Sequence, residues 1–265
     1  MSPSRRGLLA AGLALVAAPA LASPRTASAW IAYEGRLRAR LGDAGGGRFH
    51  AGIAQGLHDL TNRARRRAGA PAVAWHEGLA RAARAHAADL AQRVYVEHLS
   101  PEGFDPTDRL GLVARRLLCT AAENIAYRRG DAPHSAVDLM EQWRGSPPHW
   151  ANLLRDRHTH VGYGVVQREE RTYAVGLYGA PDGELAADLP FRLREPREVL
   201  AAFEGLGKPF IGVWLADELN DGARAPLTNG TLLKAGVYRV RVDRRVRDGV
   251  YTSAFGPVIA WGGAG

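Results

Sequence analysis

The pattern of apolar residues changes after Pro181-Asp182-Gly183, and this change constrains the fold more than any other feature of the 265-residue chain. Before this point apolar residues recur mainly at helical spacing, and one pair of strands is expected within residues 161–179. After it only strand patterns occur, at residues 191–193, 199–203, 210–215, 232–242 and 250–259. The sequence therefore predicts an α+β fold, in which a mixed domain precedes a small all-β, sandwich-like module.

Five helices are predicted before this boundary, over residues 30–41, 49–68, 77–93, 107–118 and 135–144. The first is expected to form an N-terminal arm, which a flexible break at the glycine-rich residues 42–47 follows. Residues 123–126 are expected in a turn or a short extended segment. Pro147 and Pro148 break the last helix and fix the direction of the chain before His149.

The N-terminus has the features of an export signal. Arg5 and Arg6 precede an apolar run over residues 10–21, and Ala20-Leu21-Ala22 has the small-x-small form that a signal peptidase accepts. This predicts a twin-arginine signal over residues 1–22, with a second cleavage site after Ala29 left open. The run is shorter than the roughly 20 residues that span a bilayer, and no later segment is longer. We therefore expect a mature chain without a transmembrane segment, located outside the cytoplasm, in the periplasm or secreted.

The cysteine content and the net charge indicate which disulfides and which partners are possible. Cys119 is the only cysteine, so no internal disulfide can form, and its neighbours Leu117 and Leu118 indicate a buried thiol. The formal net charge of +8 favours anionic partners such as lipid head groups or an acidic cell-envelope polymer. Nucleic acid is not expected as a partner, because the chain is exported and shows no aromatic and basic binding module.

Residues that could bind a ligand or take part in catalysis are spread between positions 98 and 152. They are His98, Glu123, Asn124, Trp143, Ser146, His149 and Asn152. Two imidazoles and a carboxylate could hold a divalent cation or relay a proton if the fold brings them together. Glu-Asn followed by Trp-x-x-Ser-Pro-x-His-x-x-Asn, with His98-Leu99-Ser100-Pro101-Glu102-Gly103 before them, resembles the bacterial branch of the CAP superfamily, also called SCP-like.

The resemblance covers roughly residues 50 to 180 and implies an α-β-α sandwich over residues 49–181. Residues 23–48 would then be an N-terminal helical arm and linker, and residues 182–265 a C-terminal β-rich module. The resemblance also implies a ligand cleft formed by His98, Glu123, Asn124, Ser146 and His149. His98 and His149 would be the metal ligands, for zinc or another divalent cation. Ser146 stands where eukaryotic members commonly carry a second Glu, which leaves metal binding open.

Three functions follow from the resemblance and stay open at this point. The first is an exported protein whose His/Glu/His cleft binds a lipid or a cell-wall fragment, with or without weak binding of a metal. The second is a metal-assisted, peptidase-like hydrolase, in which His98 and His149 hold the metal and Glu123 is the candidate base. The third is a structural or adhesive surface protein. The sequence does not decide whether the chain is an enzyme.

Other polar residues have simpler explanations. Ser146 is expected to cap a helix end, and a Ser146–His149 hydrolase pair is disfavoured because Pro147 and Pro148 disrupt the helical spacing. His158 and His160 could share one face of a strand, but packing at the edge of the sheet is expected instead of metal binding. His86 is expected in the core.

Overall fold

The computed structural model describes residues 25–193, 197–203, 210–227 and 233–262. The expected export signal, residues 1–22, lies outside these ranges. Among the residues that the structure describes, no helix is both long enough and apolar enough to cross a membrane.

The first domain is built on a sheet with the strand order β1-β5-β6-β4, and β2 pairs in parallel with β5. The other pairs are antiparallel. Residues 123–126 are extended, since they lie within β4. The strands are β1 (Arg48–Phe49), β2 (Ala74–Trp75), β4 (Ala122–Arg129), β5 (His160–Arg168) and β6 (Arg171–Gly179).

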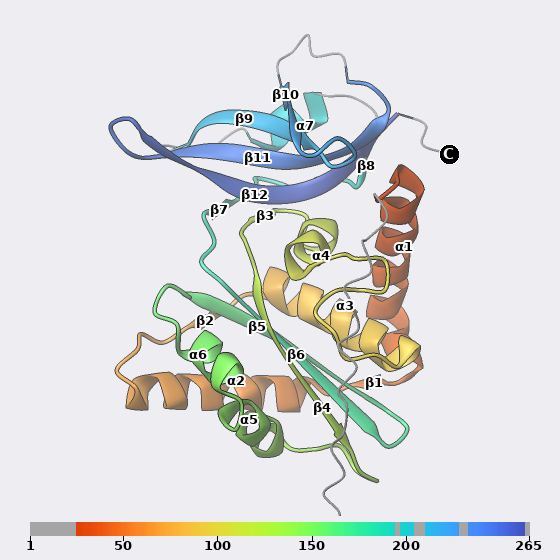
Figure 1. Ribbon diagram of the computed structural model, residues 1–265, viewed down its shortest axis with the longest axis vertical. Helices are drawn as coiled ribbons and strands as arrows, with labels where there is room; N and C mark the ends of the chain where they lie inside the picture. The colour runs from red at the N-terminus through yellow and green to blue at the C-terminus, as the bar shows by residue number, and fades with distance from the viewer. Residues whose placement is uncertain (1–24, 194–196, 204–209, 228–232, 263–265) are drawn as a thin grey trace, which may run out of the picture.

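Helices cover both faces of this sheet (Figure 1). One face packs against α1 (Ala27–Asp43), α3 (Glu77–Arg93) and α4 (Pro106–Val113), and the other against α2 (Ala51–Arg67), α5 (Ala136–Arg144) and α6 (Pro147–Leu154). Side chains alternate between the faces, so that Tyr173 and Val175 enter the first core while Ala174 and Tyr178 enter the second. The expected α-β-α sandwich is confirmed.

Two glycines in β5 allow α3 to lie directly on the sheet. A Cβ atom at Gly162 would lie 2.0 Å from the backbone nitrogen of Ala80, and one at Gly164 would lie 2.3 Å from the backbone nitrogen of Arg84. No side chain fits in such a space. The alanine-rich face of α3 and these glycines therefore bring helix and strand backbones unusually close. The helix ends at its C-cap Val94, whose backbone adopts the left-handed conformation, and the loop to His98 follows.

The N-terminal helix is part of the same core. Trp30, Tyr33 and Leu37 on α1 are fully buried and pack with residues of α3. Where a flexible break was expected after this helix, residues 44–46 form a 3-10 turn. Gly45 has a positive φ of 65°, and a Cβ atom there would lie 2.1 Å from the carbonyl oxygen of Ala88. Gly45 is thus required for close packing against α3.

The helix expected over residues 107–118 is shorter than predicted. It ends at Val113, and Leu117–Leu118 forms strand β3, which pairs with β7 (Gly183–Glu184). Both leucines are buried, and Cys119 beside them is buried as expected. A short apolar run is compatible with helix or strand, and here the pairing partner from a distant segment decides.

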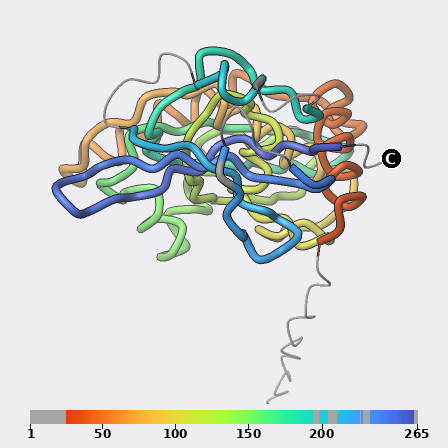
Figure 2. Tube along the Cα trace, turned by 90° about the horizontal axis from the view of Figure 1, so that it is seen from above, coloured from red at the N-terminus to blue at the C-terminus, as the bar shows by residue number. Residues whose placement is uncertain are grey.

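The β-rich character of the C-terminal module is confirmed. Its strands form one curled sheet in the order β10-β9-β11-β12-β8. Figure 2 shows these strands lying across the sandwich, with one end close to α1. Residues 199–203 were expected as a strand, but residues 199–202 belong to helix α7 (Arg197–Ala202), in which Val199 and Ala202 are buried three positions apart. The strands are β8 (Arg192–Leu193), β9 (Phe210–Asp217), β10 (Ala223–Pro226), β11 (Gly236–Arg247) and β12 (Val250–Trp261).

A buried ion cluster joins the two parts of the chain. Arg239 of β11 donates from Nη2 to Asp108 Oδ1 of α4 at 2.5 Å and from Nε to Glu218 Oε1 at 2.7 Å. The side chains of Arg239 and Asp108 are both almost fully buried. Since an unpaired buried charge is costly, this pair fixes the sheet against the sandwich.

Candidate functional site

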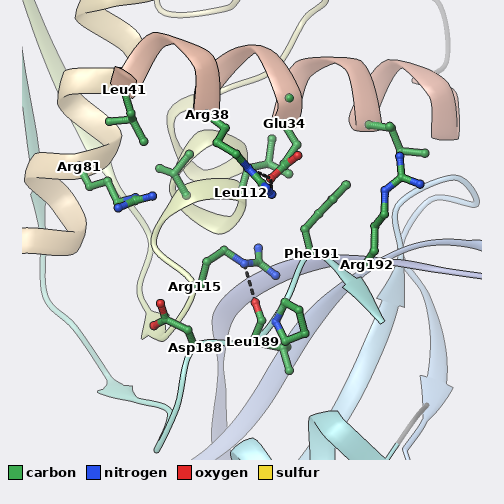
Figure 3. A pocket seen from close by; sticks show the side chains of 14 residues that line it. Glu34, Arg38, Leu41, Arg81, Leu112, Arg115, Asp188, Leu189, Phe191 and Arg192 are labelled. Carbon is green, nitrogen blue, oxygen red and sulfur yellow. Dashed lines mark hydrogen bonds and ion pairs between the residues drawn. The ribbon is translucent and has the colours of Figure 1, made fainter. Parts of the chain in front are cut away.

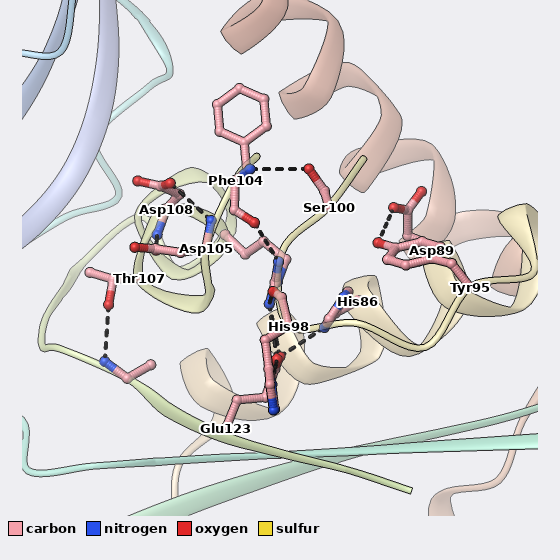
Figure 4. Close-up of polar contacts among 12 residues, drawn as sticks. His86, Asp89, Tyr95, His98, Ser100, Phe104, Asp105, Thr107, Asp108 and Glu123 are labelled. Carbon is pink, nitrogen blue, oxygen red and sulfur yellow. Dashed lines mark hydrogen bonds and ion pairs between the residues drawn. The ribbon is translucent and has the colours of Figure 1, made fainter. Parts of the chain in front are cut away.

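Glu123 is the centre of a buried polar cluster on the first domain. It lies on β4 opposite Leu177 of β6, and its side chain is 1% exposed. Arg109 of α4 donates from Nη2 to both carboxylate oxygens, at 3.1 and 3.0 Å. His86 Nδ1 lies 2.7 Å from Oε2 and His98 Nδ1 lies 2.9 Å from Oε1. Figure 4 shows the rings of His86 and His98 directed toward this carboxylate.

The electrostatics of the cluster keep Glu123 ionised. Burial by itself would raise the pKa of Glu123, but the charge of Arg109 and the hydrogen bonds from His86 and His98 outweigh burial and lower the pKa well below its ordinary value. Burial and the nearby Arg109 lower the pKa of His86, so this ring is neutral and donates from Nδ1. His86 Nε2 is buried without a hydrogen-bond partner among the described residues.

His98 connects the buried cluster to the surface. It lies in the loop after α3, and its side chain is 52% exposed. The hydrogen bond to Glu123 raises the pKa of His98, against the smaller effect of burial. Arg109 also donates from Nη2 to the carbonyl oxygen of His98 at 2.8 Å, which fixes the backbone of the loop. The Nε2 atom of His98 has no hydrogen-bond partner among the described residues and is the atom available to a ligand.

His149 lies on α6, which begins at the two prolines. Pro147 occupies the first position of the helix, where a missing backbone N–H costs nothing. Two expectations are therefore wrong. The prolines do not separate Ser146 from His149, because Ser146 Oγ lies 2.7 Å from His149 Nδ1, and Ser146 makes no side-chain capping hydrogen bond. Ser146 instead fixes the orientation of the His149 ring.

The exposed imidazole of His98 and the half-buried imidazole of His149 lie close together and differ in proton affinity. Their ring centroids are 6.4 Å apart. Partial burial and the neighbouring His98 lower the pKa of His149, while that of His98 is raised. One ring is thus held by a carboxylate and favours the charged form, and the other is held by a hydroxyl and favours the neutral form.

A chain of amides holds α6 beside β4. Asn124 donates from Nδ2 to the carbonyl oxygen of His149 at 2.9 Å, and its Oδ1 accepts from Asn152 Nδ2 at 2.9 Å. Asn152 Oδ1 lies 3.1 Å from His158 Nε2. Burial lowers the pKa of His158 to about 4, so this ring is neutral and is the donor in that contact. His158 has this structural role, and His160 packs against His76.

The structure brings together His98, Glu123, Asn124, Ser146 and His149, the five expected cleft residues. It also adds two that the sequence did not single out for the site. His86 is in the core as expected, but it also donates to Glu123. Arg109 was missed altogether. In the sequence Arg109 stands out only by its position on the otherwise apolar side of a short helix. An arginine in such a position is more often exposed at the surface.

The donor atoms do not fit a three-ligand metal centre. Among the described residues, no group of three or more His, Cys, Asp or Glu side chains is placed to hold a metal ion. Both oxygens of Glu123 already accept hydrogen bonds from Arg109, His86 and His98, so only the Nε2 atoms of His98 and His149 are left. The same contacts disfavour Glu123 as a general base, since a buried carboxylate with a strongly lowered pKa takes up a proton poorly.

Helices on both faces of a small antiparallel sheet, with a buried glutamate orienting an exposed histidine beside a second one, define an SCP-like sandwich protein. Comparison with known proteins agrees. Residues 58–178 match the profile of the CAP family, described as the Cysteine-rich secretory protein family. Residues 58–178 are thus a CAP-family domain.

Several bacterial proteins are similar to this chain. The uncharacterised protein YkwD of Bacillus subtilis (strain 168) is 30% identical over 112 residues, which are 41% of this chain and 40% of that protein. The chain thus spans less than half the length of this relative. An extracellular protein containing an SCP domain from Bacillus anthracis str. Ames is 31% identical, with a TM-score of 0.43, over 49% of this chain and 41% of the other. An outer surface protein from Borrelia burgdorferi is 16% identical, with a TM-score of 0.45, over 51% of this chain and 99% of the other.

Proposed function

We propose that this chain is an extracytoplasmic binding protein, in which His98 and His149 hold an anionic fragment of the cell wall. The observation that carries the proposal is the pairing of two imidazoles whose Nδ1 atoms are engaged by Glu123 and Ser146, which leaves both Nε2 atoms for a ligand. Rings fixed in this way lose little conformational entropy when they bind.

The charge of the cluster favours a carboxylate ligand. His98 has a raised pKa because Glu123 accepts its Nδ1 proton, so in mildly acidic conditions this ring is a charged donor at the surface. A charged donor forms stronger hydrogen bonds with oxyanions than a neutral one. The formal net charge is +8 for the full sequence and 8 − 2 = +6 without Arg5 and Arg6 of the signal, and it adds long-range attraction for an acidic polymer.

Export is part of the proposal. It is supported by the twin-arginine sequence at the N-terminus and by the family, whose description is secretory. Cleavage of residues 1–22 and location in the periplasm or outside the cell follow from it, and both stay proposals.

Divalent metal binding is at most a secondary property of this cleft. His98 and His149 could supply two nitrogen ligands to zinc, and the bound wall fragment or water would have to supply the others. Such an incomplete set of ligands predicts weak metal binding.

The metal-assisted hydrolase is the less supported alternative, because its candidate base Glu123 is buried and accepts hydrogen bonds on both oxygens. A lipid ligand is also less supported, since the free donor atoms of the cluster are imidazole nitrogens, although Val96 and Leu99 beside His98 are exposed. A structural or adhesive role is the outcome if the cleft binds nothing.

The test is calorimetric titration of the purified chain with soluble peptidoglycan fragments that carry free carboxylates. We expect binding at pH 6 that weakens at pH 8, and a loss of about tenfold or more in affinity in His98→Gln and in His149→Gln. Neutral chitin oligosaccharides of similar length are the ligand control.

His160→Gln is the matched protein control, because His160 is a half-buried imidazole in the same domain that packs against His76. It should bind like the unchanged protein. Equal binding of neutral and acidic fragments, or unchanged affinity in both His98→Gln and His149→Gln, would exclude the proposed cleft. A separate titration with Zn²⁺ tests the metal, which is ruled out if these two variants bind zinc as the unchanged protein does.

A further inference from the structure

A large cavity lies away from the histidine cluster, between α1, α4 and residues 188–192 that lead into the C-terminal sheet. Its volume is about 940 Å³, within the range of small-molecule sites. Figure 3 shows the side chains of these three segments converging on it. No residue of the His98–Glu123–His149 cluster lines it, and α1 and residues 188–192 lie outside the part that matches the CAP family.

Arginine dominates the charges of this cavity. Its lining contains Arg38, Arg81, Arg115 and Arg192, against two acids, Glu34 and Asp188. Arg38 is paired with Glu34. Within the described ranges, the other three arginines have no ion pair with a carboxylate. Four arginines against two acids leave the lining with a surplus of positive charge, although Glu34 and Asp188 both act electrostatically on Arg115.

Arg115 is the deepest of these cations. Its Nε donates to the carbonyl oxygen of Leu189 at 2.7 Å, and its Nη1 donates to the carbonyl oxygens of Gly111 and Val258. Burial lowers the pKa of Arg115 to about 10, so it is still charged at neutral pH. Its Nη2 is buried and has no hydrogen-bond partner among the described residues. A buried charged group with an unused donor is unfavourable unless an acceptor is supplied.

The remaining wall is apolar, with one glycine that packing does not explain. Ile31, Leu41, Leu112 and Phe191 line the cavity beside the arginines. Gly35 lies in the middle of α1, where glycine is less favourable than alanine by roughly 1 kcal/mol. A Cβ atom there would meet nothing within 4 Å. No contact in the described protein requires a glycine at this position, and its small size enlarges the cavity.

We propose that this cavity is a second binding site, for an amphiphile with an oxyanion head, in which Arg81, Arg115 and Arg192 hold the head and the apolar wall holds the body. The oxyanion is a carboxylate or a phosphate, both of which guanidinium groups bind in the same bidentate geometry. The site is assembled by three segments far apart in the sequence, so it exists only when the C-terminal module is docked on the sandwich. It does not depend on the proposed function of the histidine cleft.

The experiment is calorimetric titration of the full chain with dodecanoate and with dodecyl phosphate, each below its micelle concentration. Dodecyltrimethylammonium is the charge-reversed probe, and inorganic phosphate is the head without a body. We expect one site for the anionic amphiphiles, with a preference that identifies the carboxylate or the phosphate as the natural head. The double variant Arg81→Gln/Arg192→Gln should bind the anionic amphiphiles about tenfold or more weakly than the unchanged protein.

Two further variants keep the result specific. Gly35→Phe should abolish binding by filling the cavity, while circular dichroism and the thermal midpoint show that it folds. Arg67→Gln, which changes an exposed arginine of α2, should bind like the unchanged protein. Equal binding of the cationic amphiphile, equal binding of inorganic phosphate alone, or unchanged binding in a folded Gly35→Phe protein would overturn the proposal. His149→Gln should leave amphiphile binding unchanged. The proposal for the cavity and the proposal for the histidine cleft can therefore fail independently.

Discussion

The buried cluster around Glu123 makes the sharpest prediction. Glu123→Gln keeps the shape of the side chain and removes its charge. In the native protein this carboxylate accepts hydrogen bonds from Arg109, His86 and His98, and its side chain is 1% exposed. Arg109 would then be buried without a counter-charge, with the carbonyl oxygens of Phe104 and His98 as its other acceptors.

The magnitude follows from these three partners. A hydrogen bond to a charged group contributes about 1.5 to 3 kcal/mol, and one between neutral groups about 0.5 to 1.5 kcal/mol. Neutralising Glu123 thus costs about 1 kcal/mol for each partner, or about 3 kcal/mol in total. This agrees with the lower end of the roughly 3 to 5 kcal/mol lost when one member of a buried ion pair is removed. For a domain of this size, we expect the thermal midpoint to fall by about 6 to 12 °C.

Urea unfolding followed by circular dichroism measures this loss. Glu170→Gln is the control, because Glu170 forms an exposed ion pair with Arg129 and should leave stability unchanged within error. A second readout is the pKa of His98 from NMR, which should fall in Glu123→Gln because the hydrogen bond that raises it has lost its charge. The reasoning is refuted if the variant loses less than about 1 kcal/mol and the His98 titration does not move.

Three other predictions test the fold around the site. Gly164→Ala should cost about 3 kcal/mol, because its Cβ would lie 2.3 Å from the α3 backbone, while Gly52→Ala, with open space around it, should cost nothing in the same urea assay. Arg239→Met should cost about 3 kcal/mol, because Glu218 loses its ion pair with Arg239 and the buried Asp108 keeps only Arg25 as a charged partner among the described residues, and faster proteolysis of residues 236–261 would show it. The lowered pKa of His158 means that the unfolded chain takes up a proton first as pH falls. Thermal stability should therefore be full above about pH 6.5 and fall toward pH 4, less steeply in His158→Gln.

The sequence predicted much of the fold because helical spacing and glycine placement are local signals. Residues 77–93 form a helix as predicted, with the same bounds, since small apolar residues recur along one face. Residues 199–203 and 107–118 were assigned wrongly in part, because a short apolar run does not show whether it will pair with a distant strand. The glycines at 42–47 were interpreted as flexible, although at Gly45 and Gly47 a neighbouring backbone that the sequence cannot show leaves no room for a Cβ atom.

The sequence alone determined the order of the first five helices, the CAP resemblance and the identity of five polar residues that the fold gathers, because each depends on residue types at fixed spacing. The tertiary structure decided what those residues can do. It placed Arg109 and His86 on Glu123, which makes the carboxylate a buried support for His98, and it put Ser146 on His149. It also formed the arginine-lined cavity from α1, α4 and residues 188–192. Burial and charge pairing depend on distances between segments that are remote in the chain, and these distances exist only after folding.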